Sequence, residues 1–425
     1  MGKDIGIVGA GTAGLHLGLF LRGEGIDCTL YTSRTPDQVR RGRILNTVAH
    51  HHVTLERERA LGVYHWPAEE YGYFGHHYFV NGERPREFYG RYEEPSRAVD
   101  YRIYHPRLME DFEAMGGKIV YQDVDSARLH ALHRLHDLVV VSTGRGATRN
   151  LFKRDERESH HDKPLRLLCA GLFRGIRPRE SSAVTMYFSP GHGEMIEIPT
   201  LSFDGMCTAL VIENVPDGEL AGLSRQSYAE NPRAFLDNLM RSLEEHYSPI
   251  MERLDPAEFD LAGGASDLLQ GGFTPTVRVS HIRQDDDRVI PTLGDVHALV
   301  DPMTGQGANL ASHAAWVMGE AIRDSGVFDR RFMEQVDGLR NERIFCANRW
   351  TNYLLSHLVD MPTELQNVFE ALESSQSMRD EFTDNFNYPE RQWNCFASPA
   401  RMHQWAAMHT VVPASATAPR CCRVS

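Results

Sequence analysis

The sequence has few cysteines, and none of them form a paired motif. Seven cysteines are scattered over 425 residues without any C-x-x-C spacing. This pattern disfavours a disulfide framework, a structural zinc site and the redox-active disulfide of flavin disulfide reductases. The chain also lacks an excess of positive charge, since its formal net charge is −13. Nucleic acid and anionic membrane surfaces are therefore not expected as main partners.

Long apolar runs and targeting signals are missing as well. No segment reaches about 18 consecutive apolar residues, so we expect no membrane span. The N-terminus leads directly into a strand pattern, without a basic region or a small-residue cleavage site. We therefore expect no signal peptide and a cytoplasmic location. The length favours two or three domains.

The first informative stretch is residues 4–14, DIGIVGAGTAG, where a short apolar run ends in a Gly-x-Gly-x-x-Gly turn. This pattern predicts a buried parallel strand, a tight turn and a helix N-terminus that faces a dinucleotide pyrophosphate. The first glycine permits the turn, the second lets phosphates approach the backbone, and the third lets helix and strand pack closely. The expected cofactor contacts in this loop are Gly9, Gly11, Thr12, Ala13 and Gly14.

The next predicted strand, residues 27–32, completes a βαβ unit and supports the nucleotide interpretation. Dinucleotide-binding folds often place an acidic residue after this strand, where it holds the ribose. Here the strand is followed by Ser33 and Arg34, with no carboxylate. The contacts at the adenosine end therefore stay open.

A second nucleotide signature lies far along the chain. Residues 289–295 form an apolar strand that ends in Gly-Asp, and a glycine-rich loop at 301–309 leads into a predicted helix over 310–322. The aspartate can accept a ribitol hydroxyl, and the helix N-terminus stabilises negative charge on a reduced flavin. The expected cofactor contacts here are Asp295, Gly305, Gly307, Ala308 and Asn309.

The chain between these signatures has a different pattern. Residues 185–214 alternate as antiparallel strands do, and the turn Asn81-Gly82 predicts a hairpin over about 73–88. Residues 137–144 form another buried strand, so the nucleotide domain is discontinuous. A helix is expected to open at His105-Pro106, because proline is common at the first helical position. Residues 341–407 are expected to be helical.

Three adjacent histidines, His50, His51 and His52, suggest a metal site. Adjacent residues in regular structure cannot all point at one ion, and no aspartate or cysteine is suitably spaced. The sequence therefore predicts no metal.

Five strings carry a resemblance that covers nearly the whole chain; they lie at 6–21, 45–50, 189–194, 301–309 and 380–393. Through them the chain resembles the glutathione-reductase-like FAD monooxygenases and, more closely, the epoxidase components of styrene monooxygenases. The resemblance implies an α/β fold with a Rossmann-like FAD-binding domain, an inserted antiparallel β-sheet substrate domain and C-terminal helices. The expected ranges are 1–70, 100–175 and 282–345 for the FAD domain, 71–99 and 176–281 for the substrate domain, 346–412 for the helices and 413–425 for a flexible tail.

The resemblance also implies a reaction: epoxidation of styrene and related aryl alkenes with O2 and reduced FAD, through a flavin C4a-hydroperoxide. The strand ending at 142–146 lacks the Asp-Gly motif of single-component hydroxylases, which bind NAD(P)H. Reduced FAD is therefore expected from a separate NADH-dependent flavin reductase. A homodimer is a further expectation at the level of the family.

By family likeness, Arg43, Asn46 and the loop 302–309 lie near the isoalloxazine, and Arg43 and Asn46 are the catalytic candidates. An alkene needs no deprotonation, so the pocket should orient the ring and exclude water. The candidate pocket residues are Val48, His50, Tyr73, His76, Ser96, Pro302 and Met303.

Three alternatives stay open beside styrene epoxidation. An indole-type oxygenase of the same family is the nearest, although Asn46 and the pocket residues at 48, 50, 73, 76 and 96 resemble the styrene-type set. A flavin-dependent halogenase is less favoured, because the chain has no Trp-x-Trp-x-Ile-Pro string and no suitably placed lysine. A non-catalytic binding protein on the same fold is disfavoured by the two FAD-facing signatures.

Overall fold

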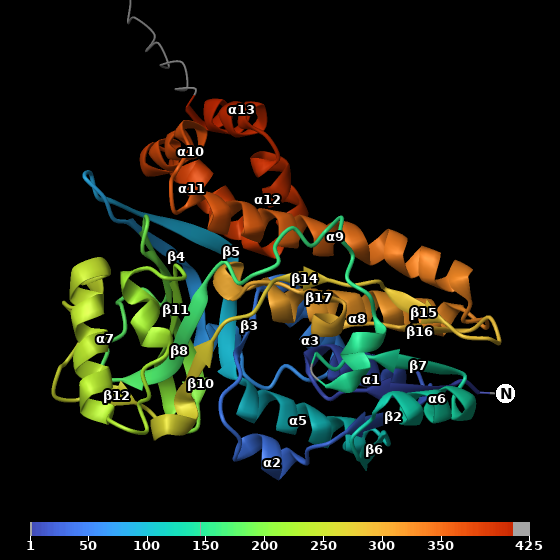
Figure 1. The fold of residues 1–425 in the computed structure, drawn as a ribbon. Helices are drawn as coiled ribbons and strands as arrows, with labels where there is room; N and C mark the ends of the chain where they lie inside the picture. Colours follow the sequence, from blue (N-terminus) through green and yellow to red (C-terminus); the bar gives the residue numbers. More distant parts are fainter. Residues whose placement is uncertain (1, 145, 411–425) are drawn as a thin grey trace, which may run out of the picture.

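The computed structural model describes residues 2–144 and 146–410, which form two larger β-sheets, two two-stranded sheets and a C-terminal group of helices (Figure 1). The predicted tail at 413–425 lies outside the described residues. The smaller sheet is parallel, with the strand order β6-β2-β1-β7. Its strands are β1 (Asp4–Val8), β2 (Asp27–Thr32), β6 (Lys118–Tyr121) and β7 (Leu138–Val141).

The second nucleotide signature joins this sheet at the edge formed by β7. Val141 makes a parallel bridge to Thr292, and the backbone N–H of Leu293 donates to the carbonyl of Val141 at 2.8 Å. This contact follows β16 (Val289–Pro291), which pairs with β15 (His281–Arg283). The second signature therefore lies against the edge of the parallel sheet, next to β7, through one bridge, while β15 and β16 form a two-stranded sheet of their own.

The larger sheet has the order β12-β8-β11-β10-β9-β4-β5-β3, with β13 also paired to β8. It is mixed rather than purely antiparallel, because β4 pairs with β9 and β5 pairs with β10 in parallel. Its strands are β3 (Thr47–His50), β4 (Gly72–Val80), β5 (Arg86–Asp100), β8 (Leu167–Arg174), β9 (Val184–Ser189), β10 (Gly193–Ser202), β11 (Gly205–Asn214), β12 (Asp260–Leu261) and β13 (Leu268–Gly271).

Two of these strands lie inside the ranges expected for the FAD domain. β3 pairs with β5 in the register Val48 to Val99, and β8 pairs with β11. Residues 47–50 and 167–174 thus belong to the larger sheet, and the domain boundaries shift accordingly. The paired strands β4 and β5 form the expected hairpin around Asn81 and Gly82.

Helix α5 (Tyr101–Ala114) begins earlier than the sequence indicated. The side chain of Asp100 caps it by accepting a hydrogen bond from the backbone N–H of Arg102 at 2.9 Å. Pro106 lies inside this helix rather than at its first position. The cap at Asp100 fixes the start of the helix. Because proline has no backbone N–H, the helix lacks one backbone hydrogen bond at Pro106.

The remaining helices surround the two sheets. They are α1 (Thr12–Gly23), α2 (Pro36–Arg40), α3 (His52–Leu61), α4 (Ala68–Tyr71), α6 (Ser126–Leu135), α7 (Pro232–His246), α8 (Gln306–Asp324), α9 (Arg330–His357), α10 (Thr363–Ser374), α11 (Gln376–Asp384), α12 (Pro389–Phe396) and α13 (Pro399–Thr410). The short 3₁₀ helices are η1 (Ala147–Leu151), η2 (Glu219–Ser224), η3 (Ser248–Ile250), η4 (Gly264–Asp267), η5 (Gly294–Val296), η6 (Pro302–Thr304) and η7 (Asn385–Asn387), and β14 (Thr276–Val277) pairs with β17 (Ala298–Leu299).

The C-terminal helices pack against the β4–β5 hairpin. α10 to α13 gather at the top of Figure 1, above the long helix α9. Trp350, Phe382 and Phe386 share one buried apolar cluster with Tyr78 and Phe88 of the hairpin. None of the helices in the described part of the chain combines the length and apolar character needed to cross a bilayer.

Candidate functional site

The loop between β1 and α1 has the backbone that a dinucleotide site needs. Gly9 has φ +115°, a left-handed conformation that favours glycine. A Cβ on Gly14 would overlap the carbonyl oxygen of Gly9, so this glycine lets the helix pack on the strand. A Cβ on Gly11 would meet nothing within 4 Å. Helix α1 starts here without a side-chain cap, so its first amides face open space beside Gly11.

The loop after β16 meets the first loop directly. A Cβ on Gly294 would lie 3.1 Å from the Cβ of Ala13, at the N-terminus of α1. A Cβ on Gly144 would lie 2.7 Å from the Cβ of Asp295. Thr12 is fixed by a 3.0 Å contact between its Oγ1 and Nε2 of His105. The predicted cofactor residues of the two signatures therefore line one region around the start of α1.

The third glycine loop leads from η6 into α8. The side chain of Asp301 accepts a hydrogen bond from the backbone N–H of Met303 at 3.1 Å. Gly305 has φ +62°, and a Cβ on Gly307 would meet nothing within 4 Å. This gives the start of α8 the same open character as the start of α1, with Ala308 in its first turn.

Asn309 holds this loop against β3. Its Oδ1 accepts from the backbone N–H of His51 at 3.0 Å. Its Nδ2 donates to the carbonyl oxygens of Ala49 at 3.0 Å and Gly305 at 2.8 Å. The side chain of Asn309 is therefore bonded to protein backbone, and its contribution to the site is to position the loop.

The predicted pocket residues form a closely packed wall. Val48, His50, Tyr73, His76, Ser96 and Met303 are each at most 3% exposed. Tyr73 on β4 lies opposite Ser96 on β5. Pro302 lies beside Met303 in η6 and is half-buried.

A chain of polar groups, which no sequence pattern predicts, runs through this wall. Nε2 of His76 lies 2.7 Å from the hydroxyl of Tyr92, which lies 3.4 Å from Nδ1 of His51. The other ring nitrogen of His51 is buried without a hydrogen-bond partner. That Nε2 lies 3.9 Å from the position of a Cβ on Gly305, so it faces the third glycine loop.

Arg43 and Asn46, the two catalytic candidates, lie on the exposed segment between α2 and β3. Nε of Arg43 donates to the carbonyl of Leu268 at 2.7 Å, and its own carbonyl accepts from the hydroxyl of Tyr101 at 2.9 Å. These contacts tie the segment to β13 and α5. The structure does not bring Arg43 and Asn46 into the buried group with the other pocket residues.

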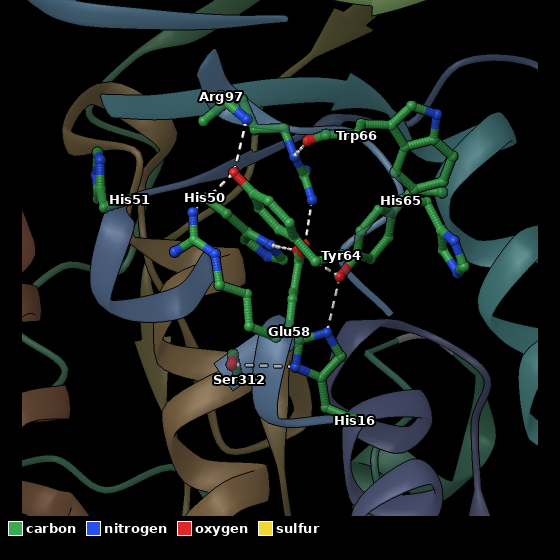
Figure 2. A network of polar contacts seen from close by, with 12 residues as sticks. His16, His50, His51, Glu58, Tyr64, His65, Trp66, Arg97 and Ser312 are labelled. Carbon is green, nitrogen blue, oxygen red and sulfur yellow. Dashed lines mark hydrogen bonds and ion pairs between the residues drawn. The ribbon is translucent and has the colours of Figure 1, made fainter. Parts of the chain in front are cut away.

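His50 points away from His51 into a second buried network, drawn in Figure 2. Its Nδ1 lies 2.5 Å from a carboxylate oxygen of Glu58. The same carboxylate accepts from Arg97 and, at 2.8 Å, from the hydroxyl of Tyr104. His16 of α1 continues the network to Tyr104 at 2.8 Å.

The network also links helix α1 to helix α8. The other ring nitrogen of His16 lies 3.0 Å from the hydroxyl of Ser312 in α8 (Figure 2). The helices that follow two of the glycine loops are thereby linked to each other and, through Glu58, to β3 and β5. Sequence reasoning missed Glu58 because acidic residues on helices are usually exposed.

Burial sets the charge of these groups. It lowers the pKa of His51 and of His16 to about 3, and it lowers the pKa of His76 well below its ordinary value. Burial would raise the pKa of Glu58, but the charge of Arg97 and the hydrogen bond from His50 leave it lowered. At neutral pH the wall therefore carries uncharged imidazoles, and Glu58 is ionised against Arg97.

Two surface hollows lie away from this wall. One, of about 350 Å³, is lined by residues that include Phe79, Arg179 and Arg253. The other, of about 500 Å³, is lined by residues that include Tyr353 and Trp393. Neither is lined by a predicted site residue, whereas the predicted pocket residues are almost fully buried. The predicted pocket residues therefore line neither of these two hollows.

Comparison with known proteins adds a full-length likeness. Residues 144–253 match the family model described as "Styrene monooxygenase A putative substrate binding domain". The chain is 54% identical over 405 residues to styrene monooxygenase StyA of Pseudomonas fluorescens, a match that covers 95% of this chain and 98% of that protein. It is 53% identical over 407 residues to styrene monooxygenase StyA of a Pseudomonas species, covering 96% and 98%.

A solved structure shares the fold at much lower identity. The flavin-dependent brominase Bmp2 superimposes with a TM-score of 0.67 at 14% identity, and the match covers 96% of this chain and 99% of that one. Such identity bears on the fold alone. It agrees with the predicted combination of a parallel nucleotide-type sheet, a second larger sheet and C-terminal helices.

Proposed function

The chain belongs to the styrene monooxygenase family, and from this membership we propose that it epoxidises styrene and related aryl alkenes with O2 and reduced FAD. The observation that carries the proposal is the identity of 54% over 95% of this chain and 98% of a styrene monooxygenase. A likeness of this extent includes the glycine loops, the β-rich middle and the C-terminal helices together.

The residues present fit FAD. Gly11 and Gly307 have open space where a side chain would project, and both stand at the start of a helix without a side-chain cap. Helix N-termini of this kind stabilise negative charge, as the pyrophosphate and the reduced ring carry. Asp295 lies beside Gly144, where a carboxylate would accept a ribitol hydroxyl.

Reduced FAD, when bound, supplies two electrons to O2, so that one oxygen atom enters the epoxide and the other leaves as water. The alkene loses no proton in this reaction, so no side chain needs to act as a base on the substrate. The chain's task is to orient the vinyl arene and keep water out. Buried Val48, Tyr73 and Met303 suit an apolar ring, and the lowered pKa of His76 keeps that imidazole uncharged.

The direct test is turnover with FAD reduced beforehand, O2 and styrene. We expect styrene oxide in amounts that account for most of the reduced FAD consumed, detected by chiral chromatography. A parallel reaction with indole tests the indole-type alternative. The proposal fails if styrene gives no epoxide and the hydrogen peroxide formed accounts for all of the reduced FAD that is oxidised.

We also propose that a separate NADH-dependent flavin reductase supplies the reduced FAD. The sequence lacks the motif expected for NAD(P)H binding after β7. The pure chain mixed with NADH and FAD should therefore reduce the flavin negligibly, and addition of a flavin reductase should start turnover. Rapid flavin reduction by the chain alone would contradict the two-component arrangement.

A further inference from the structure

Three potential metal ligands converge at one end of the larger sheet. His192 lies in the turn between β9 and β10, Glu219 begins η2, and His246 ends α7. Their donor atoms all lie within 4.8 Å of one another. In Figure 1, α7 lies at the opposite side of the molecule from α1, β2 and β7, so this group is separate from the glycine loop that precedes α1.

The carboxylate of Glu219 lies near both imidazoles without a hydrogen bond to either. Nδ1 of His192 lies 3.6 Å from Oε2 of Glu219, and Nε2 of His246 lies 3.8 Å from the same oxygen. Both separations are too long for hydrogen bonds. Two ligands of a tetrahedral zinc ion, with bonds of about 2.0–2.2 Å, lie about 3.3–3.6 Å apart. The two separations to Glu219 are therefore at or slightly above ligand spacing, and the rings of His192 and His246 lie side by side, with centroids 4.4 Å apart.

His246 gives an independent indication of a ligand. Its side chain is only 9% exposed, yet its Nε2 is buried without any hydrogen-bond partner. Its Nδ1 lies 3.5 Å from the hydroxyl of Ser189, a contact that orients the ring and leaves Nε2 for a ligand.

The backbone holds these residues in place. The carbonyl of His192 accepts from the N–H of Val215 at 3.0 Å, and the carbonyl of Val215 accepts from the N–H of Gly218 at 3.0 Å. The turn that carries His192 is thus linked, through Val215, to Gly218, the residue before Glu219. The C-terminal end of α7, where His246 lies, favours a cation through the helix dipole.

From this geometry we propose that His192, Glu219 and His246 bind one divalent transition-metal ion, with Zn²⁺ as the expected ion and water as its fourth ligand. Two imidazoles and a carboxylate suit zinc better than magnesium or calcium. The ion ties the β9–β10 turn, η2 and α7 together, so its binding stabilises this part of the fold. Sequence reasoning considered only the adjacent histidines 50–52 and predicted no metal.

The test is a metal titration of the untagged full chain after treatment with a chelator. Cys421 and Cys422 are replaced by serine in every sample, because cysteine thiolates are zinc ligands and would compete for the added metal. We expect one equivalent of Zn²⁺ to bind in competition with a chromophoric chelator. One equivalent of Co²⁺ should give visible d–d absorption of a four-coordinate site, and Zn²⁺ should raise the thermal unfolding midpoint.

The variants His192→Ala and Glu219→Gln change exposed ligands, so the metal-free protein should unfold at the parent's temperature. Each should lose affinity by about 100-fold or more, since even residues that only orient metal ligands cost about 10- to 100-fold. The control is His130→Ala, which removes an exposed histidine on α6 and should leave affinity unchanged. The proposal fails if the parent binds no stoichiometric ion, or if both ligand variants bind Zn²⁺ as the parent does.

Discussion

At the residue scale, Glu58 is a buried acid whose charge is balanced inside the fold. The side chains of Glu58 and Arg97 are both fully buried. Glu58→Gln would leave the Arg97 charge without its partner, which costs about 3–5 kcal/mol. Since about 1 kcal/mol moves the midpoint by roughly 2–4 °C in a large domain, we expect thermal unfolding many degrees lower.

The matched control for this change is Glu69→Gln. Glu69 pairs with Arg59 at 3.2 Å, and its side chain is 62% exposed. An exposed pair contributes about 0–1 kcal/mol, so calorimetry should show little change. Equal losses in the two variants would contradict the assignment of Glu58 as the centre of a buried network.

Tyr73 allows a test of the pocket wall. Tyr73→Val removes a ring that packs beside His76 and Tyr92, with centroids 6.4 and 6.2 Å away. We expect the yield of styrene oxide per reduced FAD to fall by about twofold or more, with hydrogen peroxide rising in step, because water enters and the substrate loses its orientation. Phe74→Val, on the exposed face of the same strand, serves as the control. Unchanged coupling in Tyr73→Val would remove Tyr73 from the pocket.

Some residue roles could be predicted from sequence and others could not, for a physical reason. The roles of Gly9 and Gly14 could be predicted because both belong to one short strand–turn–helix stretch. The backbone conformation of Gly9 and the contact between α1 and β1 at Gly14 depend on residues only a few positions apart. Glu58 is bound by groups 8, 39 and 46 positions away in sequence. No local pattern encodes such a meeting, so its burial is visible only in the fold.

At the scale of elements, helix α1 provides a graded series of glycines. Gly14→Ala should prevent α1 from packing on β1, because its Cβ would overlap the backbone of Gly9. Gly11→Ala should keep the fold, since its Cβ meets nothing within 4 Å, but should weaken binding of reduced FAD about tenfold or more by filling the pyrophosphate space. Gly23→Ala, with its nearest atom at 3.9 Å, is the control.

The measurements for this series are thermal unfolding and anaerobic titration with reduced FAD. We expect only Gly14→Ala to lower the unfolding midpoint strongly. Only Gly11→Ala should weaken the binding of reduced FAD while the unfolding midpoint stays unchanged. If Gly11→Ala bound reduced FAD as the parent does, the pyrophosphate would lie elsewhere.

Elements with a strong local pattern were predictable. The alternation over 185–214 corresponds to β9, β10 and β11, and the helix predicted over 310–322 lies within α8. β3 was missed because it has only four residues, which carry too little pattern. Its partners on β5 lie about 50 positions later in the sequence, since Thr47 pairs with Asp100 and His50 with Arg97. The start of α5 was misplaced because the proline signal at Pro106 was weighed above the cap at Asp100.

At the scale of the whole molecule, a pair of buried acids joins the larger sheet to the flavin loop. Glu213 lies on β11, and Asp301 directly precedes η6. Burial raises the pKa of Glu213 well above its ordinary value of 4.5, and Asp301 raises it further. Burial likewise raises the pKa of Asp301. The pair therefore retains a proton at pH values where exposed carboxyl groups are ionised.

This pair makes stability depend on pH in a defined direction. A carboxyl pKa that is raised by folding contributes stability below its ordinary value, and that contribution is lost as pH rises through the raised pKa. We expect the unfolding midpoint of the parent to fall as the pH rises above the ordinary Glu213 pKa of 4.5, and Glu213→Gln to remove part of that fall. At alkaline pH the variant should unfold about 2 °C or more above the parent, the shift that about 1 kcal/mol produces. At acidic pH the two should coincide, because the parent pair is then protonated.

Asp204→Asn, an exposed change in the turn before β11, should follow the parent throughout. A constant offset between Glu213→Gln and the parent at every pH would contradict this prediction, because it would mean that folding does not raise the pKa of Glu213.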